Sequence, residues 1–164
     1  MKLGVLSDTH LRAGDDAGVL ARLVEEGCLA DVDVILHAGD HVELGVVEMA
    51  VAPKKLISVR GNMDYGEALD LPVKRILEFE GVRIGLIHGW GAPHDLAERV
   101  AREFEGEDVD VIVFGHSHRP FEGKVGGRLL FNPGSPTDKY FAPYNSVGII
   151  ELEGGRLKTK LVKL

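Results

Sequence analysis

Five short runs of Val, Ile and Leu constrain the fold of this chain most strongly, because each ends abruptly in a polar cluster. The runs are residues 3–6, 34–36, 56–59, 84–87 and 111–114. Runs of this length and composition, bounded by Gly, are typical of strands that are buried on both faces of a sheet. Sheets of this kind are covered by helices, so we predict an α/β fold.

Segments with helical periodicity lie between these runs. The spacing of apolar residues predicts helices over 16–27 and 41–52, the second ended by Pro53. A third helix is predicted to begin at Asp95, where Asp95 and Glu98 resemble a capping box. The first half of the chain therefore reads strand, helix, strand, helix, strand. This order implies parallel strands joined by right-handed crossovers.

The last third of the chain contains strands in which apolar and polar residues alternate. They cover residues 121–125, 128–131, 147–152 and 157–161. Gly126-Gly127 and Gly154-Gly155 separate these strands in pairs and are predicted to form two-residue hairpin turns. We therefore expect an α/β core that continues into an antiparallel sheet.

Length and charge exclude several classes of protein. The 164 residues contain no internal repeat or linker, so a single domain over 1–164 is expected. The net charge of -7 and the absence of a basic run argue against nucleic acid as a partner. The apolar run after Met1 is too short for a signal peptide or a membrane span, which predicts a cytoplasmic protein. Cys28 is expected to pack as a small apolar residue.

Residues able to bind metal follow all five apolar runs. The carboxyl ends of parallel strands meet at one edge of a sheet, so these side chains are expected to converge on one crevice. A set of four His, two carboxylates and one amide suits Mn, Fe, Co, Ni or Zn better than Mg or Ca. Seven ligands are too many for one tetrahedral ion but fit two ions about 3.5–4 Å apart. The set is Asp8, His10, Asp40, Asn62, His88, His116 and His118.

Each of these residues has a simpler interpretation when it is considered alone. Asp40 could cap the following helix, Asp8 could form a turn, and each His could be an ordinary surface residue. These interpretations are independent of one another, and all of them would have to coincide at strand ends. The set as a whole therefore favours a dinuclear metal centre.

The same residues form a recognisable series of motifs. In chain order these are Asp-x-His, Gly-Asp, Gly-Asn, His-Gly and Gly-His-x-His, at 8–10, 39–40, 61–62, 88–89 and 115–118, followed by Asn132-Pro-Gly-Ser135. The series resembles the calcineurin-like metallophosphoesterases, and in particular their small bacterial and archaeal phosphodiesterases, which are related to a retromer scaffold subunit. The resemblance covers essentially the whole chain. It implies a two-sheet β-sandwich flanked by helices, in four layers.

The resemblance also implies roles for the predicted ligands. Asp8, His10 and His118 would hold the first ion, Asn62, His88 and His116 the second, and Asp40 would bridge the two. The ions would be divalent, with Mn as first choice and Ni, Fe, Co or Zn as alternatives. A hydroxide held between them would attack phosphorus in line with the leaving oxygen of a small phosphate ester. Asp40, Asn62 and His88 are accordingly the predicted catalytic residues.

One position departs from the pattern of the wider superfamily. Many members carry a His directly after Gly-Asn that can protonate the leaving group, whereas this chain has Met63. A thioether cannot donate a proton, so we expect poor activity on esters with basic leaving groups and favour a phosphodiesterase. His41 and His94 are candidate replacements for the missing acid. Trp90, together with Asn62, is a candidate substrate contact.

The supporting residues and two other functions complete the predictions. Asp64 is expected to form a turn or to support the site, and His37 is expected to be a hydrogen-bonded core residue. The segment Asn132–Ser135 either shapes the pocket wall or is a plain turn.

A protein-interaction scaffold and a nuclease are the alternative functions on the same fold. A second subunit could contribute to selectivity, which would require a homo-oligomer.

Overall fold

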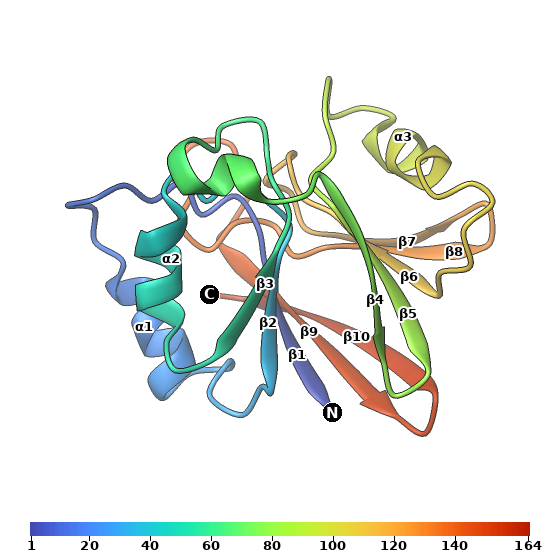
Figure 1. Cartoon of the computed structure of the whole chain (residues 1–164), viewed down its shortest axis with the longest axis horizontal. Coiled ribbons are helices and arrows are strands. Elements are labelled where there is room, and N and C mark those ends of the chain that lie inside the picture. Colours follow the sequence, from blue (N-terminus) through green and yellow to red (C-terminus); the bar gives the residue numbers. More distant parts are fainter.

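The computed structural model describes all 164 residues and contains two five-stranded sheets packed face to face (Figure 1). The first sheet has the order β10 (Arg156–Lys163), β9 (Ser146–Glu153), β1 (Lys2–Leu6), β2 (Val34–His37), β3 (Lys55–Ser58). The second has the order β4 (Lys74–Phe79), β5 (Val82–Ile87), β6 (Val111–Val113), β8 (Arg128–Asn132), β7 (Phe121–Val125). The helices are α1 (Gly18–Glu25), α2 (Leu44–Val51), α3 (Leu96–Arg102) and a short 3-10 helix, Gly66–Asp70. None of them is long and apolar enough to cross a membrane.

Alternation of side chains along the strands produces four layers. In β1, Leu3 and Val5 face the core between the sheets, whereas Leu6 faces the core beneath α1 and α2. In β6, Val111 points into the core between the sheets and Ile112 packs with residues of α3. Helices α1 and α2 therefore cover the outer face of the first sheet, and α3 covers that of the second (Figure 1). The predicted two-sheet sandwich flanked by helices is confirmed.

The predicted strand directions are present in the first half of the chain and in both hairpins of the last third, but the two hairpins belong to different sheets. Strands β1, β2 and β3 are parallel, as predicted. The Gly126-Gly127 and Gly154-Gly155 turns are present, with positive φ at all four residues. The two hairpins do not form one antiparallel sheet, however. Strand β8 pairs with β6 in the second sheet and β9 pairs with β1 in the first, so each hairpin completes a different sheet.

Strand β4 was not predicted from the sequence. It is an edge strand that pairs antiparallel with β5, and charged residues interrupt its apolar residues. The turn between the two strands is Glu80-Gly81, with φ of 51° and 79°. Positive φ at both central residues gives the twist that a two-residue hairpin needs. Glu80-Gly81 is therefore the sequence feature from which this hairpin could have been predicted.

The helices begin later than the sequence predicts. Helix α2 starts at Leu44 because the backbone of residues 40–42 is held in a loop by the side chain of Asp64. Helix α1 starts at Gly18, whose N–H group donates to the carboxylate of Asp16. At α3, Asp95 has a left-handed φ of 55° and its side chain caps no N–H group. The capping box predicted there is therefore wrong.

Candidate metal centre

Loops that follow strands of both sheets bring five of the seven predicted ligands together. Asp8 and His10 follow β1, Asp40 follows β2, His88 follows β5 and His118 lies in the loop after β6. Two groups form, each with its ligand atoms within 4.8 Å of one another: Asp8, His10 and His118, and Asp8, Asp40 and His88. The site therefore lies at the carboxyl ends of strands, as the sequence predicts, and needs both sheets.

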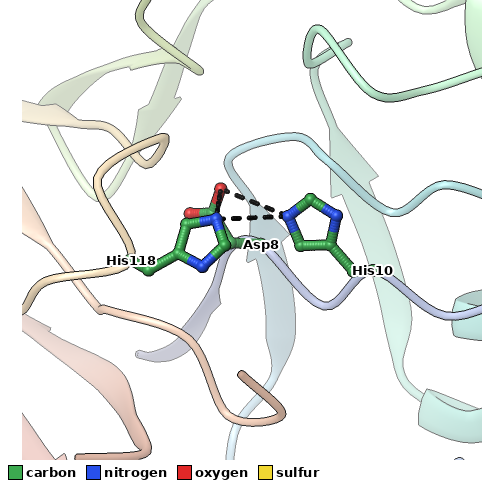
Figure 2. A group of neighbouring side chains, drawn as sticks. All are labelled: Asp8, His10 and His118. Atoms are coloured by element: carbon green, nitrogen blue, oxygen red, sulfur yellow. Dashed lines mark hydrogen bonds and ion pairs between the residues drawn. The ribbon is translucent and has the colours of Figure 1, made fainter. Parts of the chain in front are cut away.

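Asp8 belongs to both groups. Its Oδ1 lies 3.4 Å from His118 Nε2 and 3.9 Å from His88 Nε2. Figure 2 shows the first group, in which the two imidazole rings point at the Asp8 carboxylate and their Nε2 atoms are 3.2 Å apart. Because none of the carboxylate is exposed to solvent, its charge needs partners inside the protein.

The carboxylate of Asp40 belongs to the second group and also approaches the first. Its Oδ2 is 3.6 Å from His10 Nε2 and 3.3 Å from His88 Nε2. Its Oδ1 accepts the backbone N–H of Met63 at 2.7 Å, which fixes the carboxylate orientation. Oδ2 of Asp40 therefore faces His10 of the first group and His88 of the second.

Asn62 and His116 lie beside these groups rather than within them. His116 Nε2 lies 2.7 Å from the carbonyl oxygen of Gly91. Its Nδ1 atom lies 3.0 Å from Asn62 Oδ1. The rings of His116 and His88 meet edge to face, with centroids 5.2 Å apart. Asn62 and His116 thus form a pair of donor atoms next to His88.

Hydrogen bonds at the far side of two imidazoles orient them toward the carboxylates. His88 Nδ1 donates to the carbonyl of Ala38 at 2.7 Å, and His118 Nδ1 donates to the carboxylate of Asp138 at 2.6 Å. When these rings are neutral, each Nε2 atom carries the lone pair with which imidazole binds metal. His88 Nε2 is buried without any hydrogen-bond partner. A divalent cation would satisfy this atom, so the donor set fits a metal ion.

The backbone at these residues is unusual. Five of the predicted ligands have φ between 47° and 70°: Asp8, His10, Asp40, His116 and His118. This left-handed region is uncommon for residues other than Gly, and it costs about 1 kcal/mol or more for each residue. Such strain persists where surrounding contacts hold it in place and is typical of functional sites.

Charges in the site shift the pKa of both aspartates. Burial raises the pKa of Asp8, and the neighbouring His88 and His118 oppose that effect only in part. Burial also acts to raise the pKa of Asp40, but the nearby imidazole of His88, whose Nε2 lies 3.3 Å from Oδ2, outweighs this effect and the pKa is lowered. Binding of a cation requires both carboxylates in their charged form, so metal binding and proton release are coupled here.

Asp64 holds the loop that carries Asp40. Its carboxylate accepts the N–H groups of Gly61, Asp40 and Val42 and the Nδ1–H of His41. Burial acts to raise its pKa, but these hydrogen bonds and the charge of His41 lower the pKa to about 2. Asp64 therefore supports the site, as expected.

A cavity of about 760 Å³ opens beside the two groups. Its wall includes five predicted ligands, which are His10, Asp40, Asn62, His116 and His118. Met63, which stands where many members of the superfamily carry a His, also lines the cavity. The candidate acids His41 and His94 and the candidate substrate contact Trp90 do not line the cavity. His41 is completely buried and stacks on His37, His94 points to solvent with 79% of its side chain exposed, and Trp90 lies outside the lining. Neither His41 nor His94 therefore lies at the cavity.

Two expected supporting features are present as hydrogen bonds. His37 is a buried residue of β2 whose Nε2 lies 3.1 Å from Thr9 Oγ1, so it is a hydrogen-bonded core histidine. In the segment 132–135, Asn132 Nδ2 donates to the carbonyl of Gly115 and Ser135 Oγ donates to that of Asp8. This turn therefore fixes the loops that carry Asp8 and His116 rather than lining the cavity.

Sequence reasoning missed Asp138. Its carboxylate lies against His118, twenty residues earlier in the chain, and it also accepts three backbone N–H groups of its own loop. These hydrogen bonds outweigh the effect of burial and lower its pKa. No motif marks this residue, because its role depends on how the loop after β8 folds back toward His118.

The fold and the Asp/His groups together define a class of metal-binding α/β sandwich proteins. The sequence matches the family model of the calcineurin-like phosphoesterase superfamily domain over residues 1–155, and the chain belongs to this superfamily. A protein of Methanocaldococcus jannaschii named as a probable metallophosphoesterase is 37% identical over 100% of this chain and 82% of its own length. A second protein of that organism, named as a phosphodiesterase, is 26% identical over 93% of this chain and 94% of its own length.

Solved structures share the fold. Vps29 of Chaetomium thermophilum has a TM-score of 0.76 at 22% identity, covering 100% of this chain and 97% of that one. A structure described as a novel archaeal phosphodiesterase has a TM-score of 0.74 at 23% identity, covering 99% of this chain and 100% of that one. A protein of Thermotoga maritima solved by NMR has a TM-score of 0.70 at 33% identity and 99% coverage of both chains.

Proposed function

We propose that this chain is a metal-dependent phosphodiesterase with a dinuclear centre. The observation that carries the proposal is the pair of Asp/His groups that share Asp8. Asp40 of the second group also faces His10 of the first, and the buried His88 Nε2 has no hydrogen-bond partner. Membership of the phosphoesterase superfamily supports the reaction class. The relative named as a phosphodiesterase supports the choice of a diester.

The donor atoms divide into two sets. By the resemblance to the family, Asp8, His10 and His118 would hold one divalent ion and His88, His116 and Asn62 the other. Asp40, whose Oδ2 faces both His10 and His88, would bridge the two ions. We favour Mn, with Ni, Fe, Co or Zn as alternatives, because nitrogen and oxygen donors are mixed. When bound, such ions polarise phosphoryl oxygens and lower the pKa of an attacking water.

The residues of the chain itself bind and orient the ester. Asn62 and His116 lie on the cavity wall beside the donor atoms, where a phosphate oxygen of a bound ester would come within reach. Met63 lies on the same wall and offers no proton to a leaving group. The reaction therefore favours esters whose leaving group departs without protonation, such as aryl diesters.

The test is hydrolysis of an aryl phosphodiester by the purified protein with added Mn or Ni. We expect His88→Ala and Asp40→Ala to lose activity by at least about a hundredfold, since each removes a donor atom. His94→Ala is the matched control, because this His is exposed and lies outside the cavity. Absence of turnover by the metal-loaded wild type, or full activity of either donor variant, would contradict the proposal.

Two other functions use the same fold. The likeness to Vps29 extends to the fold alone, and an interaction scaffold would not need the buried carboxylates and imidazoles described above. A nuclease would need a surface that binds a polyanion, which the net charge of -7 opposes. A gel shift with DNA and RNA at low salt separates the nuclease, and turnover of the aryl phosphodiester by the metal-loaded protein separates the scaffold.

A further inference from the structure

Two aromatic side chains are exposed on the wall of the cavity. Tyr140 is 86% exposed and Phe141 is 71% exposed, and both line the cavity beside His118. They lie in the loop between β8 and β9, which has no helix or strand of its own. Large apolar side chains exposed side by side next to a polar site are typical of a binding surface.

The aromatic loop is fastened to the candidate metal centre through Asp138. The Asp138 carboxylate accepts the N–H groups of Tyr140 at 2.8 Å, Phe141 at 3.1 Å and Ala142 at 2.8 Å, and the Nδ1–H of His118 at 2.6 Å. The ring of Phe141 meets the His118 ring edge to face, with centroids 5.8 Å apart. Phe141 is therefore held at a fixed position next to a donor of the first group.

Other apolar side chains complete the cavity. Leu11, Val19 and Met63 line it together with the aromatic loop. A volume of about 760 Å³ is far larger than a phosphate group requires and falls in the range of pockets that hold a whole small molecule. A phosphate bound at the donor atoms would leave the rest of the cavity to the organic group of the ester.

We propose that Tyr140 and Phe141 are specificity-determining residues that stack on a planar aromatic group of the substrate. This inference rests on the proposed phosphodiesterase function and deepens it. The group would be carried on the side of the ester that stays bound to phosphorus, and a nucleobase and a simple aryl ring share the chemistry that these side chains recognise.

The first experiment uses two diesters with the same leaving group. Bis(p-nitrophenyl) phosphate and methyl p-nitrophenyl phosphate both release p-nitrophenolate and differ in the group that remains. The kcat/KM of the bis-aryl diester divided by that of the methyl diester therefore measures recognition of the remaining aryl ring. We expect Phe141→Ala and Tyr140→Ala each to reduce the ratio by about tenfold, mainly through the KM of the aryl diester.

Tyr144→Ala is the matched control for these two variants. Tyr144 belongs to the same loop and is exposed, but it lies outside the cavity lining, with Lys163 over its ring. The control should keep the wild-type ratio. If Phe141→Ala and Tyr140→Ala leave the ratio unchanged, either because both diesters slow by the same factor or because neither is affected, the inference is overturned. The loop would then act only on the position of His118 or contact another molecule.

The second experiment does not depend on turnover and distinguishes a nucleobase from a bare aryl ring. Calorimetry on the Mn-loaded protein compares adenosine 5′-monophosphate with ribose 5-phosphate, which lacks the base. We expect the nucleotide to bind about tenfold more tightly, and this preference to disappear in Phe141→Ala. A wild-type protein that binds both ligands equally and has the same kcat/KM for both diesters would refute the inference. A clear nucleotide preference without hydrolysis of either diester would refute only the proposed function.

Discussion

At the scale of single residues, the candidate site depends on how Asp8 is held. The N–H group of His116 lies 3.2 Å and 3.0 Å from its two carboxylate oxygens, and Ser135 Oγ donates to its backbone carbonyl at 2.7 Å. These contacts come from residues more than a hundred positions away in the chain. Asp8 is therefore placed by the whole fold rather than by its own turn.

The contact between Asp138 and His118 predicts a loss of metal affinity when Asp138 is changed. In Asp138→Asn the amide oxygen can still accept the Nδ1–H of His118, but the lost negative charge lowers the basicity of the ring, so the affinity for Mn should fall about 10–100-fold. Calorimetric titration of metal-free protein measures the change. Asp108→Asn is the control, because 91% of that side chain is exposed. An unchanged affinity in Asp138→Asn would show that His118 does not need this partner.

The pKa of Asp64 predicts how stability depends on pH. Its pKa is about 2 in the folded protein against an ordinary value of 3.8, so the folded state favours the charged form. A lowered pKa stabilises the fold above pH 4, and this contribution, about 2 kcal/mol, is lost as the pH falls from about 4 to 2.

Denaturant unfolding of the wild type and of Asp64→Asn, measured from pH 6 to pH 2, tests this expectation. The amide cannot be ionised, so the difference in unfolding free energy between the two proteins should shrink as the pH falls below 4. A difference that stays constant over this range would contradict the assigned pKa.

At the scale of elements, close packing of α3 against the second sheet depends on a glycine in β5. A Cβ atom at Gly85 would lie 2.6 Å from Cε1 of Phe104, a ring that is completely buried just after α3. The sequence predicts both the strand and the helix from their apolar periodicity. It gives no sign that this glycine is the point of contact, because the contact joins separate elements.

This packing predicts opposite effects for two Gly→Ala changes. Gly85→Ala should destabilise the protein by about 1–3 kcal/mol, since the buried ring cannot move away without strain. Gly45→Ala, in the first turn of α2 with nothing within 4 Å of the added Cβ, should stabilise it by about 0.5 kcal/mol. Thermal unfolding of both variants measures the two shifts. A Gly85→Ala protein as stable as the wild type would mean that α3 adjusts its position freely.

At the scale of the whole molecule, one core joins the two sheets. Leu3 and Leu36 of the first sheet pack in the same cluster as Ile84, Val113 and Phe131 of the second. The candidate metal centre likewise takes its donor atoms from loops of both sheets. We therefore propose that residues 1–164 unfold as a single domain. The cytoplasmic location and the possibility of a homo-oligomer stay predictions.

Calorimetry of unfolding tests the single domain and the metal centre together. We expect one transition whose calorimetric and van't Hoff enthalpies agree. Saturating Mn, at about a hundred times its Kd, should stabilise the wild type by about 3 kcal/mol and raise Tm, and a chelator should reverse the shift. His88→Ala should show a much smaller shift. Two separate transitions would contradict the single domain, and equal Mn shifts in both proteins would contradict the role of His88.

The sequence by itself determined most of the strands and helices and the types of residue that follow the strands. Periodicity of apolar residues is local, so the strands, the helices and the polar residues that follow the strands could be predicted from neighbouring positions. The tertiary structure decided which distant groups meet. It placed Asp138 on His118, put Tyr140 and Phe141 at the cavity, and left His41, His94 and Trp90 outside it. Contacts between loops depend on how both sheets fold together, and no pattern of neighbouring residues records them.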